Sequence, residues 1–116
     1  MDWDDVRRIA LGLPDVGEGT SWGKPAFKIN NRAFVHPSRE DGAIFLPLAD
    51  EDARLLIAAK PEVYFLTSHY EGWGVLLRLD AVDENELAGA LEDAYAFQAE
   101  KKPLKPRRAA KRRPSA

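Results

Sequence analysis

The first hydrophobic pattern in the chain has the spacing of an amphipathic helix. Its apolar residues recur at intervals of three or four, at Trp3, Val6, Ile9, Ala10 and Leu13. Asp2 precedes the run and is suited to cap it, and Gly12 to Pro14 predict its end. Residues 15–21 carry three turn-forming signals and no sustained period, so we expect a loop there.

From Ala26 onward the spacing becomes that of short strands. Apolar runs cover residues 26–29, 32–36 and 43–48. Asn30 and Asn31 separate the first two runs and tolerate positive φ, which predicts a tight hairpin turn. We expect the three strands to form an antiparallel meander.

The remaining elements are bounded by clear start and stop signals. Asp50 is suited to cap a short helix that Pro61 ends, after which strands are expected over residues 62–66 and 74–79. Asp83 and Glu86 resemble a capping box at the start of a long helix over residues 84–100, with Gly89 on its outer face. The order α-β-β-β-α-β-β-α predicts an α+β fold in which helices pack on one face of an antiparallel sheet.

Several short motifs follow one another in a recognisable order. They are Leu-Pro at 13–14, Trp-Gly-Lys-Pro-Ala-Phe at 22–27, the hairpin Ile-Asn-Asn-Arg-Ala-Phe at 29–34, Gly-Trp-Gly-Val at 72–75, and a closing helix from Glu-Leu at 86–87 to Ala-Tyr at 94–95. This set resembles the MmcQ/YjbR family of small bacterial proteins over roughly residues 3–98. The resemblance implies a compact α+β fold similar to the frataxin-like (CyaY-like) fold, a double-wing arrangement, and DNA binding.

The formal net charge of −2 conceals two oppositely charged parts. Residues 1–100 contain nine basic and nineteen acidic groups, a charge of −10, whereas residues 101–116 contain eight basic groups and no acidic one, a charge of +8. The basic part also has three prolines and one large apolar residue, so it cannot bury enough apolar surface to fold alone. We therefore expect an α+β domain over residues 1–100 and a basic disordered tail over 101–116, which lies outside the family pattern.

Composition excludes several classes of protein. The chain has no cysteine, which rules out disulfides and thiolate metal sites. No apolar run approaches the roughly 20 residues of a membrane span, and the acidic N-terminus is unlike a signal peptide. We expect a cytoplasmic protein that does not contact a membrane.

Two basic sets are candidates for binding nucleic acid. The first belongs to the predicted hairpin region and consists of Lys24, Lys28, Arg32 and Arg39. Lys28 and Arg32 flank the tight turn and would point the same way if the strand register placed them opposite each other. Cations on a β-ribbon can contact phosphates, although exposed charges on strands also serve simply to solvate a sheet.

The second set is the tail, with Lys101, Lys102, Lys105, Arg107, Arg108, Lys111, Arg112 and Arg113. If six of these residues neutralise phosphates, the slope of log affinity against log salt concentration, the salt slope, would be about −5. No aromatic residue is interleaved, so the tail cannot stack on bases. A solubilising tail, or contact with an acidic protein partner, would fit the same charges.

Other chemistry has little support in the sequence. His36 and His69 lack the spacing of a metal site. The stretch Ser-His-Tyr-Glu at 68–71 contains residue types found in catalytic sites, but adjacency in the sequence does not make a catalytic triad. We therefore predict no catalytic residue, no metal and no cofactor. Trp22 and Trp73 at strand entrances are either core residues or the walls of a ligand cleft. The expected function is weak, largely sequence-independent DNA binding, and the alternative is a small protein-interaction or ligand-binding module.

Overall fold

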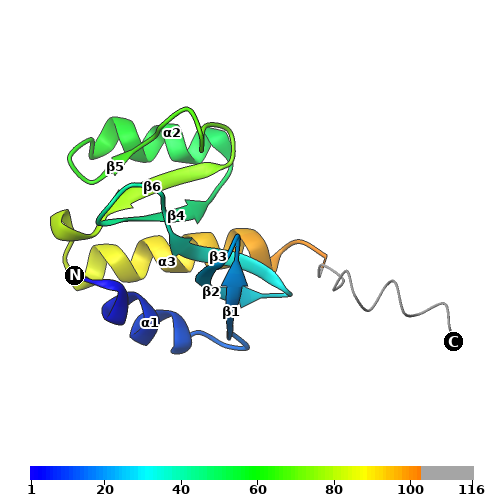
Figure 1. Cartoon of the computed structure of the whole chain (residues 1–116). Helices are drawn as coiled ribbons and strands as arrows, with labels where there is room; N and C mark the ends of the chain where they lie inside the picture. Colours follow the sequence, from blue (N-terminus) through cyan, green and yellow to red (C-terminus); the bar gives the residue numbers. More distant parts are fainter. Residues whose placement is uncertain (103–116) are drawn as a thin grey trace, which may run out of the picture.

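Four consecutive strands begin the sheet in the computed structural model, which describes residues 1–102 (Figure 1). They are β1 (Gly17–Ser21), β2 (Lys24–Ile29), β3 (Arg32–Pro37) and β4 (Ala43–Pro47). Asn30 and Asn31, with φ of 56° and 61°, form the predicted tight turn between β2 and β3. Trp22 and Gly23 join β1 to β2 with φ of 55° and 78°, which is the backbone of the same kind of two-residue turn.

Strand β1 was not expected, because residues 15–21 carry the composition of a loop. Its residues are small or polar, and most of them are exposed. The strand forms through backbone pairing with β2, in a register that runs from Gly17 opposite Lys28 to Ser21 opposite Lys24. An edge strand of this kind is stabilised by its hydrogen-bond ladder and by the turn that follows it, and neither leaves a hydrophobic pattern.

The other elements follow the predicted order. They are α1 (Trp3–Leu11), α2 (Asp50–Ala59), β5 (Tyr64–Phe65), β6 (Gly74–Arg78), the short 3-10 helix η1 (Leu79–Ala81) and α3 (Glu84–Ala99). The six strands lie in the order β1-β2-β3-β4-β6-β5, and every neighbouring pair is antiparallel. The α+β class is confirmed, and the element order becomes α-β-β-β-β-α-β-β-α.

All three α-helices pack on one face of the sheet. Their buried contributions to a common core are Val6 and Ala10 from α1, Ala53 from α2, and Leu87, Ala90, Leu91 and Ala94 from α3. Helix α3 lies between α1 and α2 and contacts β2, β3 and β4 (Figure 1). Within residues 1–102, no helix is long and apolar enough to cross a membrane.

The helix starts agree with two of the three predicted caps. The Asp2 side chain accepts from the Asp5 amide at 3.1 Å, and Asp83 accepts from the Glu86 amide at 2.8 Å. Glu86 does not complete a capping box, because its carboxylate instead accepts hydrogen bonds from Tyr64 and Lys60. The expectation for Asp50 was wrong: the cap position of α2 is Ala49, and Asp50 lies in the first turn, where it favours the helix dipole.

Two glycines have opposite surroundings. Gly89 lies on the exposed side of α3, and a Cβ atom there would meet no other atom within 4 Å. A Cβ on Gly74 would lie 2.1 Å from the carbonyl oxygen of Leu46 on β4. The close approach of β4 and β6 at this point therefore depends on glycine.

Candidate binding site on the helix-free face of the sheet

A β-bulge between β2 and β3 decides which side chains reach the helix-free face. Phe27 pairs with Val35 but the next residue, Lys28, pairs with Ala33, so Phe34 is the extra residue in β3. Phe34 and Val35 are consequently both fully buried in the core on the helix side. The following residue, His36, is turned to the opposite face, which is a usual effect of a bulge.

His36 begins a row of rings across this face. It lies opposite Phe45 on β4, with ring centroids 5.3 Å apart. Phe45 stacks on Tyr70, from the loop between β5 and β6, at 4.9 Å. These rings, together with the buried Leu76 of β6, make a flat apolar floor on the side of the sheet away from the helices.

Hydrogen bonds fix the loops around this floor. The hydroxyl of Tyr70 accepts from the backbone amide of Arg39 at 2.9 Å. The Arg39 guanidinium lies 3.1 Å from Nδ1 of His69, and because a guanidinium can only donate, that nitrogen is the acceptor. The loop after β3 and the loop before β6 are thus joined, and they present a cation at the edge of the floor.

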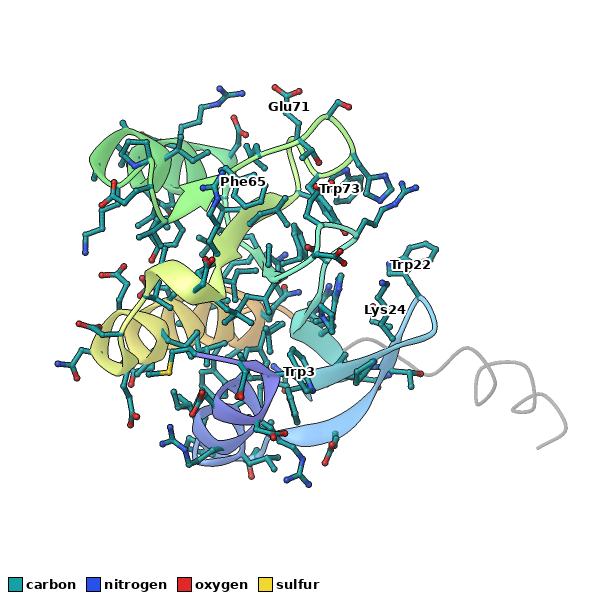
Figure 2. All side chains as sticks on the ribbon, turned by 60° about the vertical axis from the view of Figure 1, so that its left-hand side comes forward. Trp3, Trp22, Lys24, Phe65, Glu71 and Trp73 are labelled. Carbon is teal, nitrogen blue, oxygen red and sulfur yellow. The ribbon has the colours of Figure 1, made fainter. Side chains whose placement is uncertain are left out.

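A hollow of about 620 Å³ opens above the floor. Its lining consists of Trp22, Lys24, His36, Arg39, Phe45, His69, Tyr70 and Trp73. Trp22, at the tip of the β1–β2 hairpin, is 91% exposed, and Trp73, just before β6, is 72% exposed. Figure 2 shows both indoles on the same side of the molecule, with Lys24 below Trp22. The lining includes two basic side chains and no acidic one.

The local environment favours the neutral form of His36 by lowering the pKa of its imidazole. Burial lowers the pKa of its imidazole and nearby Lys24 lowers it further, while a hydrogen bond to the Pro37 carbonyl acts in the opposite direction. In the neutral form, Nδ1–H donates to that carbonyl at 2.8 Å and Nε2 carries no proton. The favoured neutral form of His36 thus lines the same hollow as the cations of Lys24 and Arg39.

This environment predicts how stability depends on pH. Because the folded-state pKa of His36 is lowered, the free energy of unfolding should fall as the pH decreases below about 6.5, where the unfolded chain binds a proton that folded His36 resists. Replacing His36 with Gln should weaken that dependence, measured by urea denaturation at about pH 7.5 and about pH 5.5. His69→Gln is the matched control, since it removes an exposed imidazole; an equal effect of both variants would contradict the assignment to His36.

The predicted basic residues do not all lie together. Lys24 and Arg39 line the hollow, and the side chain of Lys28 lies along Gly19 of the neighbouring β1 strand. The register sets Ile29, rather than Lys28, opposite Arg32. Arg32 points to the helix side instead, where its Nε donates to the Lys102 carbonyl at 3.0 Å. Lys28 and Arg32 therefore point to opposite faces.

The predicted tail residues are only partly described. Lys101 lies over the Phe97 ring, 4.0 Å from its centroid, and Lys102 follows it at the end of the described chain. Six further cations, Lys105, Arg107, Arg108, Lys111, Arg112 and Arg113, lie outside the described residues. Residues 101 and 102 stay close to the folded domain because Asn30 donates to the Lys101 carbonyl and Arg32 to the Lys102 carbonyl.

The floor of the hollow was missed by sequence reasoning. Phe45 was not singled out, and His36, His69 and Tyr70 were considered only as catalytic or metal-binding groups. The alternation of β4 offered a signal for Phe45, since Ile44 and Leu46 face the helices and Phe45 must then face away. Among residues 1–102, no group of three His, Cys, Asp or Glu side chains is arranged to hold a metal ion.

Comparison with known proteins identifies the family. The YjbR family model matches residues 11–97. Uncharacterized proteins of Mycobacterium bovis and Mycobacterium tuberculosis are 31% identical over 115 residues, which covers 85% of this chain and 89% of theirs. The fold is similar to a crystal structure of a Deinococcus radiodurans protein with a DUF419 domain, with a TM-score of 0.69 and 21% identity over 94% of this chain and 86% of that chain. Since the family model and these relatives cover most of its length, the chain belongs to the YjbR family.

Proposed function

We propose that this protein is a non-enzymatic DNA-binding protein that contacts phosphates with the helix-free face of its sheet. The observation that carries the proposal is the local charge: Lys24 and Arg39 stand together at a hollow whose lining has no carboxylate. This is unusual on a body of charge −10 over residues 1–100. A local cationic patch can bind phosphate even where the overall charge is negative, because screening limits repulsion to about 10 Å.

In this proposal the basic residues act at three places. Lys24 and Arg39 bind the DNA backbone at the hollow, and Lys28 extends the contact along the β1–β2 hairpin, which serves as a wing. The basic residues after position 100 add affinity without reading sequence. Arg32 is left out of the interface, because it points to the helix side and its Nε donates to the Lys102 carbonyl, just after α3. Since chromosomal DNA is the intended partner, we also propose a cytoplasmic location.

The experiment compares two double variants with the same loss of charge. We expect Lys24→Gln plus Arg39→Gln to weaken binding to a labelled duplex and to reduce the salt slope by about two, one for each lost phosphate contact. Fluorescence anisotropy between about 50 and 200 mM salt measures both quantities.

The control for this experiment lies on α1. Arg7→Gln plus Arg8→Gln removes two charges on the helix side, where both residues form exposed ion pairs with Glu18 and Glu84 that contribute little to stability. If the control pair weakens DNA binding as much as the pair at the hollow, the proposed interface is wrong.

A second candidate function rests on the hollow itself. Its volume of about 620 Å³ lies within the range of about 300 to 1,000 Å³ that is usual for small-molecule sites. Under this alternative the protein is a ligand-binding or protein-interaction module, and its basic tail solubilises it or contacts an acidic partner. A thermal-shift screen that finds stabilising small molecules for a protein with no DNA affinity would favour it.

A further inference from the structure

The two exposed indoles at the hollow require an explanation that the fold does not supply. Trp3, by contrast, stacks on the buried ring of Phe27 at 5.4 Å and contributes to the core. Trp22 and Trp73 leave 91% and 72% of their surface to solvent, so they add little to the core. Large aromatic side chains that remain exposed beside a hollow are typical of binding surfaces.

The backbone of Trp22 strengthens this point. Its φ of 55° lies in the left-handed region, where a bulky side chain is disfavoured and where asparagine or glycine is the usual choice in a two-residue hairpin turn. Folding alone would therefore favour a different residue at the hairpin tip. An unfavourable backbone conformation at an exposed aromatic residue is the kind of local strain that is found at functional sites.

The lining of the hollow combines two kinds of surface. Phe45 and Tyr70 provide a flat apolar floor, and the two indoles stand at its rim. Lys24 and Arg39 add positive charge at the same place. A phosphate alone would need no aromatic floor, and a purely apolar ligand would need no cations. A nucleotide has both a planar ring and a phosphate.

We infer that the hollow is a nucleobase pocket, in which Trp22 and Trp73 stack against an unpaired base while Lys24 and Arg39 bind its phosphate. This inference rests on the proposed function and specifies its substrate as single-stranded DNA. Bases inside a duplex are stacked on one another and cannot enter such a hollow, whereas single strands bind proteins through aromatic stacking and a positively charged path.

The test uses the full-length protein and three labelled probes of one length at one salt concentration. They are a mixed-sequence single strand, the same strand with abasic sites in place of its bases, and the matching duplex. We expect the single strand to bind at least about tenfold more tightly than either of the other probes, because only it offers unpaired bases along with the phosphates.

The variant Trp22→Asn plus Trp73→Ser should remove most of this preference. We expect it to weaken binding of the single strand by about tenfold or more, and to leave the salt slope and the abasic-strand affinity unchanged. Asparagine directly before Gly23 makes a preferred hairpin turn, so the variant keeps the fold, which circular dichroism and the melting temperature verify. Leu55→Gln is the control, since it removes another exposed apolar side chain, 63% exposed, from α2 on the helix side.

The outcomes separate this inference from the proposed function. Equal affinity for all three probes would overturn the base pocket and leave phosphate binding intact. An unchanged single-strand preference in the double tryptophan variant would also overturn it. If none of the probes binds, both the base pocket and the DNA-binding function are wrong.

Discussion

Deletion of residues 103–116 is expected to make the proposed DNA binding far less sensitive to salt. The deleted segment holds six of the seventeen basic residues. Each phosphate contact that a cation makes contributes about 0.9 to the slope of log affinity against log salt, so six contacts contribute about five. Raising the salt from about 50 to about 200 mM should therefore reduce the DNA affinity of the full-length protein by roughly a thousandfold more than that of the shortened protein.

The end point of this deletion follows from the structure. Stopping after Lys102 preserves the hydrogen bonds that Asn30 and Arg32 donate to the last backbone carbonyls, so the folded part is not disturbed. A full-length variant with the six cations changed to Gln separates loss of charge from loss of chain. If both altered proteins keep the salt slope of the unaltered one, the tail has no part in DNA binding.

Gly74→Ala is expected to destabilise the protein by about 3 kcal/mol or more. The new methyl group would lie 2.1 Å from the Leu46 carbonyl oxygen and 2.8 Å from the Cα atom of Pro47. Both are backbone atoms of β4, so no side chain can rotate to make room, and the β4–β6 pairing must separate. Overpacking of this kind commonly costs about 1–3 kcal/mol, and more where only the backbone can yield. Urea denaturation measures the change.

The same substitution at Gly89 serves as the control for that measurement. Gly89→Ala should raise stability by about 1 kcal/mol, because alanine favours the interior of a helix and its methyl group meets no other atom. Similar changes in stability at the two positions would show that the contact between Gly74 and β4 is not as close as described.

Local signals in the sequence were sufficient for most of the fold. The helix starts at Asp2 and Asp83 and the turn at Asn30–Asn31 depend on neighbouring residues alone, and they were predicted. Strand β1 depends on a partner strand that its own residues do not reveal. The cap of α2 was misassigned by one residue because Asp50 suits both the cap and the first turn.

The candidate site was harder to predict because it depends on contacts between distant segments. Its floor joins Phe45 to Tyr70, 25 positions later in the chain, through a loop with no hydrophobic period. The orientation of His36 depends on a bulge, which no local pattern marks. The two-residue turn at Asn30–Asn31 sets Ile29 opposite Arg32 and Lys28 opposite Ala33, so Lys28 and Arg32 point to opposite faces of the sheet.

The hydrogen bonds between the β2–β3 hairpin and the end of α3 have a consequence for the strength of the proposed DNA binding. Asn30 and Arg32 donate hydrogen bonds to the backbone carbonyls of residues 99, 101 and 102, so the described chain ends beside the β2–β3 hairpin. If both contact DNA as proposed, the hollow and the basic residues after position 100 are two linked binding sites for one DNA strand. Once one of them has bound, the other would meet neighbouring phosphates at an effective concentration in the millimolar range. Two weak contacts would then give a much higher overall affinity.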